Sequence, residues 1–301
     1  MLKSLKNFFI YWSVRALIGL LRCLSWERSL SVGALVGRLA YRLANSVRRD
    51  TVAHMQLAFP DQSVSDRERL AHAVFEHLGR AAAEVVNVHK IRDLLDYVRL
   101  DPASRGVILN LLARGRGVIF VTGHIGNWEL MARALAAEGF PIYAIGKRSY
   151  DERFTALIQK FRDQGNVKTI WRGDPDAFEK MVAVMKENSI LGLLLDQDTR
   201  VQGVFVPFFD CPAHTPTAAA VLARKTGAAV LTGFNYREPE GGLRIICEEF
   251  IPVEDDEFSH AVVRDTASMT ARIEAHIRAH PAEWVWMHRR WKTRPPNEGR
   301  A

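Results

Sequence analysis

The sequence predicts an α/β fold with a mixed, largely parallel sheet flanked by helices, preceded by an N-terminal membrane-associated helix. Three observations carry this prediction. Short apolar runs alternate with helical patterns over residues 142–195, which is typical of parallel strands joined by right-handed crossovers. The N-terminal segment is both basic and apolar. The chain has 301 residues and is 48% hydrophobic, which is enough for one large core.

The central stretch, GRGVIFVTGHIGNWEL, begins at Gly115 and reads as strand, turn and helix start. Its apolar, β-branched run 118–121 predicts a buried strand. Asn127 is placed to cap the helix that Trp128 opens. His124 therefore falls at the carboxyl end of a strand and Glu129 in the first helical turn, which is where open α/β sheets place their chemistry.

Further strands and helices are predicted in alternation after this stretch. The predicted strands are 142–145, 167–171 and 190–195, and the predicted helices are 151–162, 176–186, 217–226 and 259–280. The run GVFVPFF is predicted as a loop, and residues 229–236 and 243–250 are predicted as a hairpin. Residues 1–50 are expected to form membrane-anchoring helices, and residues 51–301 a single α/β domain.

The net charge of +7 lies entirely in residues 1–50, where nine Lys and Arg face two acidic residues. These cations are interleaved with Phe, Trp and Leu, which favours a membrane surface over nucleic acid. A helix over 7–26 would turn Arg15 and Arg22 to lipid phosphates. The alternative is an amphipathic helix packed on the protein's own core. The tail WVWMHRRWKTRPP suits either a water–membrane boundary or a buried aromatic anchor with a solvated basic end.

His124 is the side chain best suited to taking a proton near neutral pH. If Glu129 accepts a hydrogen bond from its Nδ1, Nε2 becomes a free base. Backbone N–H groups of the turn 123–127 could stabilise an oxyanion. The alternative is a satisfied buried histidine beside a helix cap.

Several other chemistries are excluded by missing motifs. The sequence has no G-x-S-x-G elbow, no H-E-x-x-H and no G-x-x-x-x-G-K-[ST], and its three cysteines are far apart. We therefore expect no metal or other cofactor. Without a protein nucleophile, His124 would activate a substrate hydroxyl for direct transfer.

Four ordered segments resemble the late acyltransferases of lipid A biosynthesis, which are related to glycerolipid acyltransferases with a His-x4-Asp/Glu dyad. They are RRDTVAHMQLAFPDQS, VTGHIGNWEL, LLDQDTRVQGVFVPFFDCPAHTPTAAAVLARKTGA and WVWMHRRWKTRP. The resemblance implies an enzyme on the cytoplasmic face of a bacterial inner membrane. That enzyme would move a fatty acyl chain from acyl carrier protein to a hydroxyl of a lipid A precursor, without nucleic acid as a partner.

The resemblance also implies roles for particular residues. His124 and Glu129 would form the catalytic dyad, and Arg162, Asp196, Asp198 and Lys147 would bind substrate. For Arg162 and Asp198 the alternative is a structural ion pair or a loop cap. Lys147 stands where many members have arginine, and Ile125 where an aromatic is common, so an ornithine lipid or glycolipid remains an alternative acceptor.

The acyl chain needs an apolar slot, and its expected walls are Val118, Phe120, Phe205, Phe208 and Phe209. A competing hypothesis is a non-catalytic peripheral lipid-binding protein that keeps the fold. The intact His124 and Glu129 pair favours the enzyme.

Overall fold

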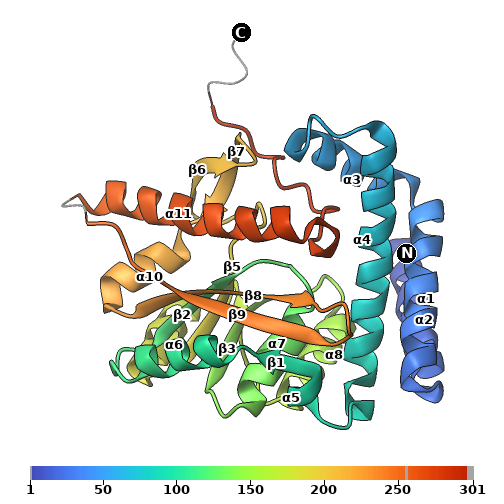
Figure 1. Cartoon of the computed structure of the whole chain (residues 1–301), viewed down its shortest axis with the longest axis horizontal. Coiled ribbons are helices and arrows are strands. Elements are labelled where there is room, and N and C mark those ends of the chain that lie inside the picture. Colours follow the sequence, from blue (N-terminus) through green and yellow to red (C-terminus); the bar gives the residue numbers. More distant parts are fainter. Residues whose placement is uncertain (1, 255–256, 297–301) are drawn as a thin grey trace.

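The computed structural model describes residues 2–254 and 257–296, and a seven-stranded sheet in the order β1-β9-β8-β2-β5-β3-β4 lies at its centre (Figure 1). The strands are β1 (Val98–Leu100), β2 (Val118–Thr122), β3 (Ile142–Lys147), β4 (Lys168–Arg172), β5 (Ile190–Leu194), β8 (Ala229–Arg237) and β9 (Leu243–Phe250). Neighbouring strands are parallel except for the antiparallel pair β8 and β9. The predicted largely parallel sheet and the predicted hairpin are therefore confirmed.

Some helices cover the two faces of this sheet, and others pack together at one end of the molecule. The helices are α1 (Leu2–Cys23), α2 (Trp26–Leu43), α3 (Asn45–Ala58), α4 (Val64–Asn87), α5 (Leu94–Tyr97), α6 (Pro102–Leu112), α7 (Trp128–Ala137), α8 (Glu152–Asp163), α9 (Ala177–Lys186), α10 (Ala218–Thr226) and α11 (Phe258–Ala279). In Figure 1, α11 lies above the sheet and α6 below it. The mixed α/β class expected from the alternating pattern is thus the observed one.

Strand β2 shows why the core divides into two clusters. All five of its residues are buried. Because successive side chains of a strand point to opposite faces, Val118 and Phe120 join the cluster under α6 and α7, whereas Ile119 and Val121 join the cluster under α9, α10 and α11. A strand covered on both sides reads as a continuous apolar run, as this sequence does.

A separate two-stranded hairpin, β6 (Gly203–Phe208) and β7 (Cys211–Pro216), follows β5. Phe209 and Asp210 form its turn with φ of +51° and +58°. Two successive left-handed residues match the twist of the flanking strands. The prediction of a loop at GVFVPFF was wrong. Residues Gly203–Phe208 form the strand β6, and the side chain of Phe208 is buried against the core.

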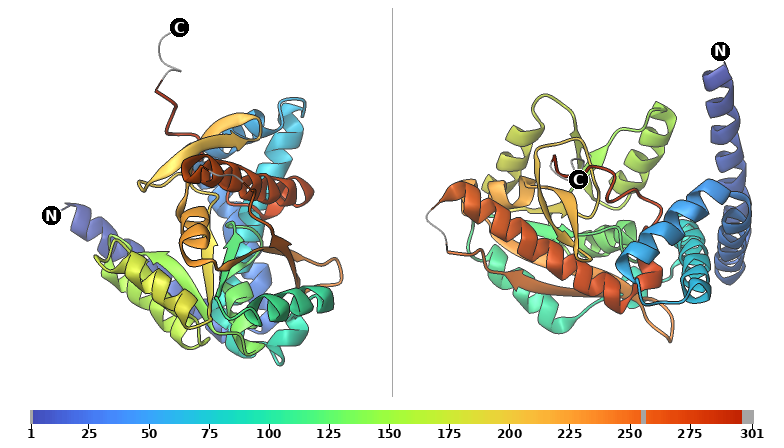
Figure 2. Two further views of the ribbon diagram at one scale, coloured as in Figure 1. Left: turned by 90° about the vertical axis from the view of Figure 1, so that its left-hand side faces the viewer. Right: turned by 90° about the horizontal axis from the view of Figure 1, so that it is seen from above.

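At one end of the molecule α1, α2 and α4 pack together (Figure 1). Figure 2 shows the amino-terminal part of α1 extending beyond the helices beside it. Large apolar side chains are exposed on α1 (Phe8, Phe9, Ile10, Trp12 and Leu20) and on α2 (Leu35, Leu39 and Leu43). Among the described residues, no helix combines the length and the apolar character that crossing a membrane requires.

The tail after α11 is part of the core. Trp284, Trp286 and Trp291 are 1%, 0% and 4% exposed. The hypothesis that these three rings lie at a water–membrane boundary was therefore wrong, and the buried-anchor alternative describes them. Their aromatic surface packs against Phe208 and Phe209 of the hairpin.

Glycines let α2 and α4 approach closely. A Cβ built on Gly37 would collide with the backbone carbonyl of Phe75, and one on Gly33 would collide with the carbonyl of Gly79. A rigid backbone on the opposite helix cannot move aside as a flexible side chain can.

We predict that Gly37→Ala lowers the free energy of unfolding by roughly 1–3 kcal/mol, the usual cost of overpacking. Gly106→Ala in α6 is the matched control, because a Cβ there meets nothing within 4 Å. Alanine should stabilise that helix by up to about 1 kcal/mol. Denaturant unfolding checks both variants, and equal stability of the two would show that α2 and α4 do not need this close approach.

Candidate functional site

The site is built around the turn that joins β2 to α7. Asn127 is the N-cap of α7, and its Oδ1 accepts the N–H of Leu130 at 3.3 Å, as the sequence predicted. His124 follows the last residue of β2 by two positions, at the carboxyl edge of the sheet. The neighbouring strands β5 and β8 end at the same edge because both run parallel to β2.

Buried groups from distant segments hold this turn. The N–H of Gly126 donates to the carbonyl of Glu283 at 3.0 Å, and the carbonyl of Gly126 lies 3.0 Å from Nε2 of His77. Gly126 has φ +60°, and a Cβ there would collide with Asn235. Asn235 in turn bonds both the N–H and the carbonyl of Asn127. The path of the turn is fixed on every side.

A buried carboxylate supports the same turn from α4. Glu84 is fully buried and accepts from the side chains of Tyr97 and Asn127, both at 2.8 Å. Nη1 of Arg237 lies 2.7 Å from it and balances its charge. Because Asn127 caps α7, this network connects the start of α7, at the carboxyl edge of the sheet, to α4.

His124 pairs with Asp196 and not with Glu129. Its Nδ1 lies 2.8 Å from Oδ1 of Asp196, the second residue after β5. The predicted hydrogen bond from Nδ1 to Glu129 was therefore wrong. The strands that precede His124 and Asp196 are direct neighbours, whereas the carboxylate of Glu129 in α7 accepts from Arg162.

The carboxylate of Asp196 is 1% exposed and fully satisfied. Its Oδ2 accepts the backbone N–H of His124 and the indole N–H of Trp284, each at 2.7 Å. Burial by itself would raise the pKa of Asp196, but the charge of His124 and the hydrogen bonds from His124 and Trp284 lower it to about 2. An ionised Asp196 only accepts hydrogen bonds, so Nδ1 of His124 is the donor in this pair and Nε2 is the ring nitrogen left for another partner.

Glu129 and Arg162 form a two-bond ion pair between α7 and α8. The guanidinium donates from Nε at 3.0 Å and from Nη2 at 2.6 Å. Two parallel bonds are the strong geometry for arginine and carboxylate. The ion-pair alternative for Arg162 thus describes its contacts, and its fork is not free for a substrate phosphate.

Asp198 contacts the tail. Its Oδ2 accepts the N–H of Thr293 at 2.8 Å, and its carbonyl accepts from Nζ of Lys292 at 2.8 Å. This is the loop-cap alternative that the sequence left open. The tail therefore encloses the D-Q-D segment, because Trp284 bonds Asp196 and Thr293 bonds Asp198.

Two cations lie farther along the same edge. Lys147 ends β3 and is exposed, and its register partner Arg172 ends β4 and is half-buried. Burial lowers the pKa of Arg172. Within the described part of the chain neither side chain has an acidic partner, whereas the adjacent Asp174 is already paired with Arg148 at 3.3 Å.

A narrow cavity of about 40 Å³ lies between α7 and the strands β2, β3 and β5. Its walls include Phe120, Met131, Leu135 and Ile142, and its polar end includes Thr122 and Trp128. The ring of Trp128 is 5.0 Å from that of His124, so the cavity and the histidine share Trp128 as a neighbour, although His124 does not itself line the cavity. Of the five predicted walls only Phe120 lines the cavity; Phe208 and Phe209 pack on the other face of the sheet.

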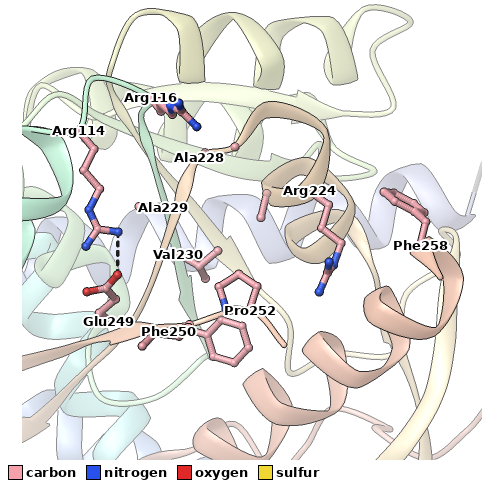
Figure 3. A pocket seen from close by; sticks show the side chains of 13 residues that line it. Arg114, Arg116, Arg224, Ala228, Ala229, Val230, Glu249, Phe250, Pro252 and Phe258 are labelled. Carbon is pink, nitrogen blue, oxygen red and sulfur yellow. Dashed lines mark ion pairs between the residues drawn. The ribbon is translucent and has the colours of Figure 1, made fainter. Parts of the chain in front are cut away.

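A broader hollow of about 790 Å³ lies at the opposite edge of the sheet (Figure 3). It is lined by Arg114, Arg116 and Arg224 where β8 begins. Arg114 pairs with Glu249 at 2.8 Å and Arg224 with Asp265 at 2.7 Å. The amino edge of β8 is remote from His124, so this hollow is not part of the site.

The site thus consists of the side chains of His124 and Asp196 and a narrow, largely apolar cavity. In the described ranges, no group of three or more His, Cys, Asp or Glu residues could hold a metal ion. Burial raises the pKa of the Cys247 thiol, which makes it a poor nucleophile. The geometry defines an α/β protein in which the pair of His124 and Asp196 lies near a narrow, largely apolar cavity.

Comparison with known proteins gives the family. The model of the bacterial lipid A biosynthesis acyltransferases matches residues 2–293, so the chain belongs to this family. The lipid A biosynthesis palmitoleoyltransferase of Escherichia coli (strain K12) is 28% identical over 277 residues, covering 89% of this chain and 86% of that protein. The lauroyltransferase of the same organism is 27% identical over 299 residues, covering 96% and 93%.

The family resemblance extends to a protein with a different name. A phosphatidylinositol mannoside acyltransferase of Mycobacterium tuberculosis (strain H37Rv) is 29% identical over 251 residues, covering 78% of this chain and 73% of that protein. The family resemblance that the sequence motifs indicated is confirmed.

Proposed function

We propose that the protein is an acyltransferase that moves a fatty acyl group from the thioester of acyl carrier protein to a hydroxyl of a lipid A precursor. The observation that carries this proposal is the pair of His124 and Asp196 beside an apolar cavity, in a chain of the lipid A acyltransferase family. The names of the two Escherichia coli relatives support acyl transfer in lipid A biosynthesis.

In this mechanism Nε2 of His124 removes the proton of the acceptor hydroxyl as its oxygen attacks the thioester carbonyl. The carbon–sulfur bond then breaks, and the leaving thiolate recovers the proton from the imidazolium. Asp196 stabilises that imidazolium and fixes its orientation. No acyl-enzyme forms, because the acceptor itself is the nucleophile.

Glu129 has a positioning role in this proposal. Its ion pair with Arg162 ties the first turn of α7 to α8 on either side of the cavity. Glu129 thereby holds the wall of the acyl slot and not the imidazole. The cavity of about 40 Å³ holds no more than a few waters. A fatty acyl chain can therefore enter it only if flexible side chains such as Met131 shift.

A second acceptor class is kept open by one comparison. The mycobacterial relative is named for a phosphatidylinositol mannoside, so relatives of this chain differ in the lipid their names give. A glycolipid or ornithine lipid acceptor would use the same dyad and slot. Product identification by mass spectrometry with each acceptor decides between them.

We predict that His124→Ala and Asp196→Asn each lower kcat on the order of a hundredfold or more, the usual scale of general-base catalysis. Glu129→Gln should lose less, since its amide oxygen still accepts from Arg162. Transfer from acyl carrier protein to a lipid A precursor is measured on variants whose melting temperatures are also recorded. A folded Asp196→Asn enzyme of normal activity, with Glu129→Gln inactive, would restore Glu129 as the partner of the base.

Lys147 and Arg172 are proposed to bind an anionic group of the acceptor. Register partners in parallel strands project to the same face, so the two cations flank one point at the carboxyl edge. With strands about 4.8 Å apart, β3 and β4 lie roughly 10 and 14 Å from β2. A phosphate held there leaves room for a sugar and a hydroxyl that reaches His124.

We predict that Lys147→Ala and Arg172→Ala each raise the acceptor KM about tenfold and leave the donor KM unchanged, because charged hydrogen bonds contribute roughly 1.5–3 kcal/mol. Lys186→Ala removes an exposed cation at the far end of α9 and is the control. An acceptor without its phosphate should show no difference between variant and wild type. A rise in the donor KM instead would assign the site to the phosphodiester of the carrier.

We also propose that α1 and α2 hold the protein on the cytoplasmic face of the inner membrane. Phe8 and Phe9 are 47% and 61% exposed beside the exposed cations Arg15 and Arg22. Apolar burial would supply most of the affinity, and each cation near anionic lipid adds roughly 1 kcal/mol.

We predict that a Phe8→Ser and Phe9→Ser double variant binds anionic vesicles at least tenfold more weakly in flotation assays, through loss of apolar burial. The control pair is Ile251→Ser and Phe258→Ser, whose side chains are 76% and 48% exposed at the opposite edge. High salt should weaken wild-type binding only in part. Equal binding by both double variants would place the membrane contact elsewhere.

A further inference from the structure

Thr122 has an unusual environment for a buried threonine. It is the last residue of β2, is 3% exposed and lines the polar end of the cavity under α7. Its Oγ1 is enclosed and has no hydrogen-bond partner among the described residues. A buried hydroxyl left in this state costs free energy, and a valine of the same shape would avoid that cost.

The other buried threonines show that the fold normally satisfies such groups. Each has a hydrogen-bond partner: Thr51, Thr155, Thr215, Thr217, Thr232, Thr266 and Thr270. Most of them donate to a backbone carbonyl of their own helix or of a neighbouring strand. Thr169 and Thr199 also have an enclosed Oγ1 without a partner in the described structure, but of the three only Thr122 lines the cavity, so its hydroxyl is the one that a ligand in the cavity can meet.

Four of the five N–H groups in the turn 123–127 already have an acceptor within the protein. The N–H of His124 donates to Asp196, that of Ile125 to Gly123, that of Gly126 to Glu283 and that of Asn127 to Asn235. The sequence-based hypothesis that the N–H groups of the turn stabilise the oxyanion was therefore wrong for these four. The developing negative charge requires another donor beside His124.

A second side chain that lines the cavity also has an unmet donor. Arg162 is 9% exposed and uses Nε and Nη2 for Glu129, which leaves Nη1 buried without a partner in the described structure. Arg162 also lines the cavity. Two side chains with unmet donors thus line an otherwise largely apolar cavity, whose wall also includes Trp128, the residue whose ring contacts that of His124.

We propose that the hydroxyl of Thr122 is a catalytic donor to the carbonyl oxygen of the acyl thioester. This rests on the proposed acyl transfer. As the hydroxyl oxygen of the acceptor bonds to the carbonyl carbon, the π electrons of the carbonyl group move to the carbonyl oxygen. The hydrogen bond from Thr122 to that carbonyl oxygen then shortens. When the carbon–sulfur bond breaks, the carbonyl re-forms and the thiolate leaves. The donor stabilises charge that exists only in the transition state.

The experiment replaces only the hydroxyl. Thr122→Val should lower kcat on the order of a hundredfold, the scale of losing one oxyanion donor, with the KM of both substrates within about twofold of wild type. Its melting temperature should stay the same or rise, because an unmet hydroxyl becomes a methyl group. Thr122→Ser should restore most of kcat.

Thr169→Val is the matched control. Thr169 in β4 also has an enclosed Oγ1 without a partner in the described residues, but it does not line the cavity. Its loss should leave kcat unchanged and affect stability as Thr122→Val does. A structural role for Thr122 would lower the melting temperature together with activity, which is the opposite pattern.

Three results overturn the proposal. The first is a normal kcat for Thr122→Val while His124→Ala is inactive. That result would reject the role of Thr122 and keep the proposed acyltransferase function. The second is a loss seen only with 3-hydroxyacyl donors, which would mean that Thr122 binds the hydroxyl of the chain. The third is a wild-type protein that transfers no acyl group from any carrier thioester, which removes the proposed function as well.

Discussion

The hydrogen bond between His124 and Asp196 is the interaction on which the arrangement of the site depends. A carboxylate buried at 1% exposure stays ionised only if its oxygens are satisfied. Strand β2 supplies two of the donors through His124, and the tail supplies the third through Trp284. The adjacency of β2 and β5 and the folded-back tail are thus both requirements of one ionised side chain.

The sheet separates the two proposed substrates by face. Ile142 and Ala144 of β3 belong to the core cluster under α7, where the cavity for the acyl chain lies, whereas Ile145 packs against the opposite cluster. Because side chains alternate, Lys147 projects to the same side as Ile145. An apolar chain and an anionic head group can therefore approach the edge near His124 from different sides without competing for one surface.

Much of this could be predicted from sequence, and the limit has a physical cause. The run 118–121, the turn and the Asn127 cap depend on local chemistry, so they were confirmed. The partner of His124 depends on strand order, which a single sequence does not state, and proximity in sequence favoured Glu129 wrongly. The sequence did hold one signal for the true partner of His124. The D-Q-D segment places acidic residues directly after β5, the parallel strand beside β2. The tail was ambiguous because tryptophan suits both a core and a membrane boundary.

The position of Trp284 and Thr293 has a consequence for biosynthesis of the protein itself. Both bond the D-Q-D segment, yet they are made about ninety residues later than it, near the end of the chain. Asp196 and Asp198 are thus synthesised well before the groups that satisfy them, so the site takes its final form only after the segment around Trp284 and Thr293 has folded back over the sheet.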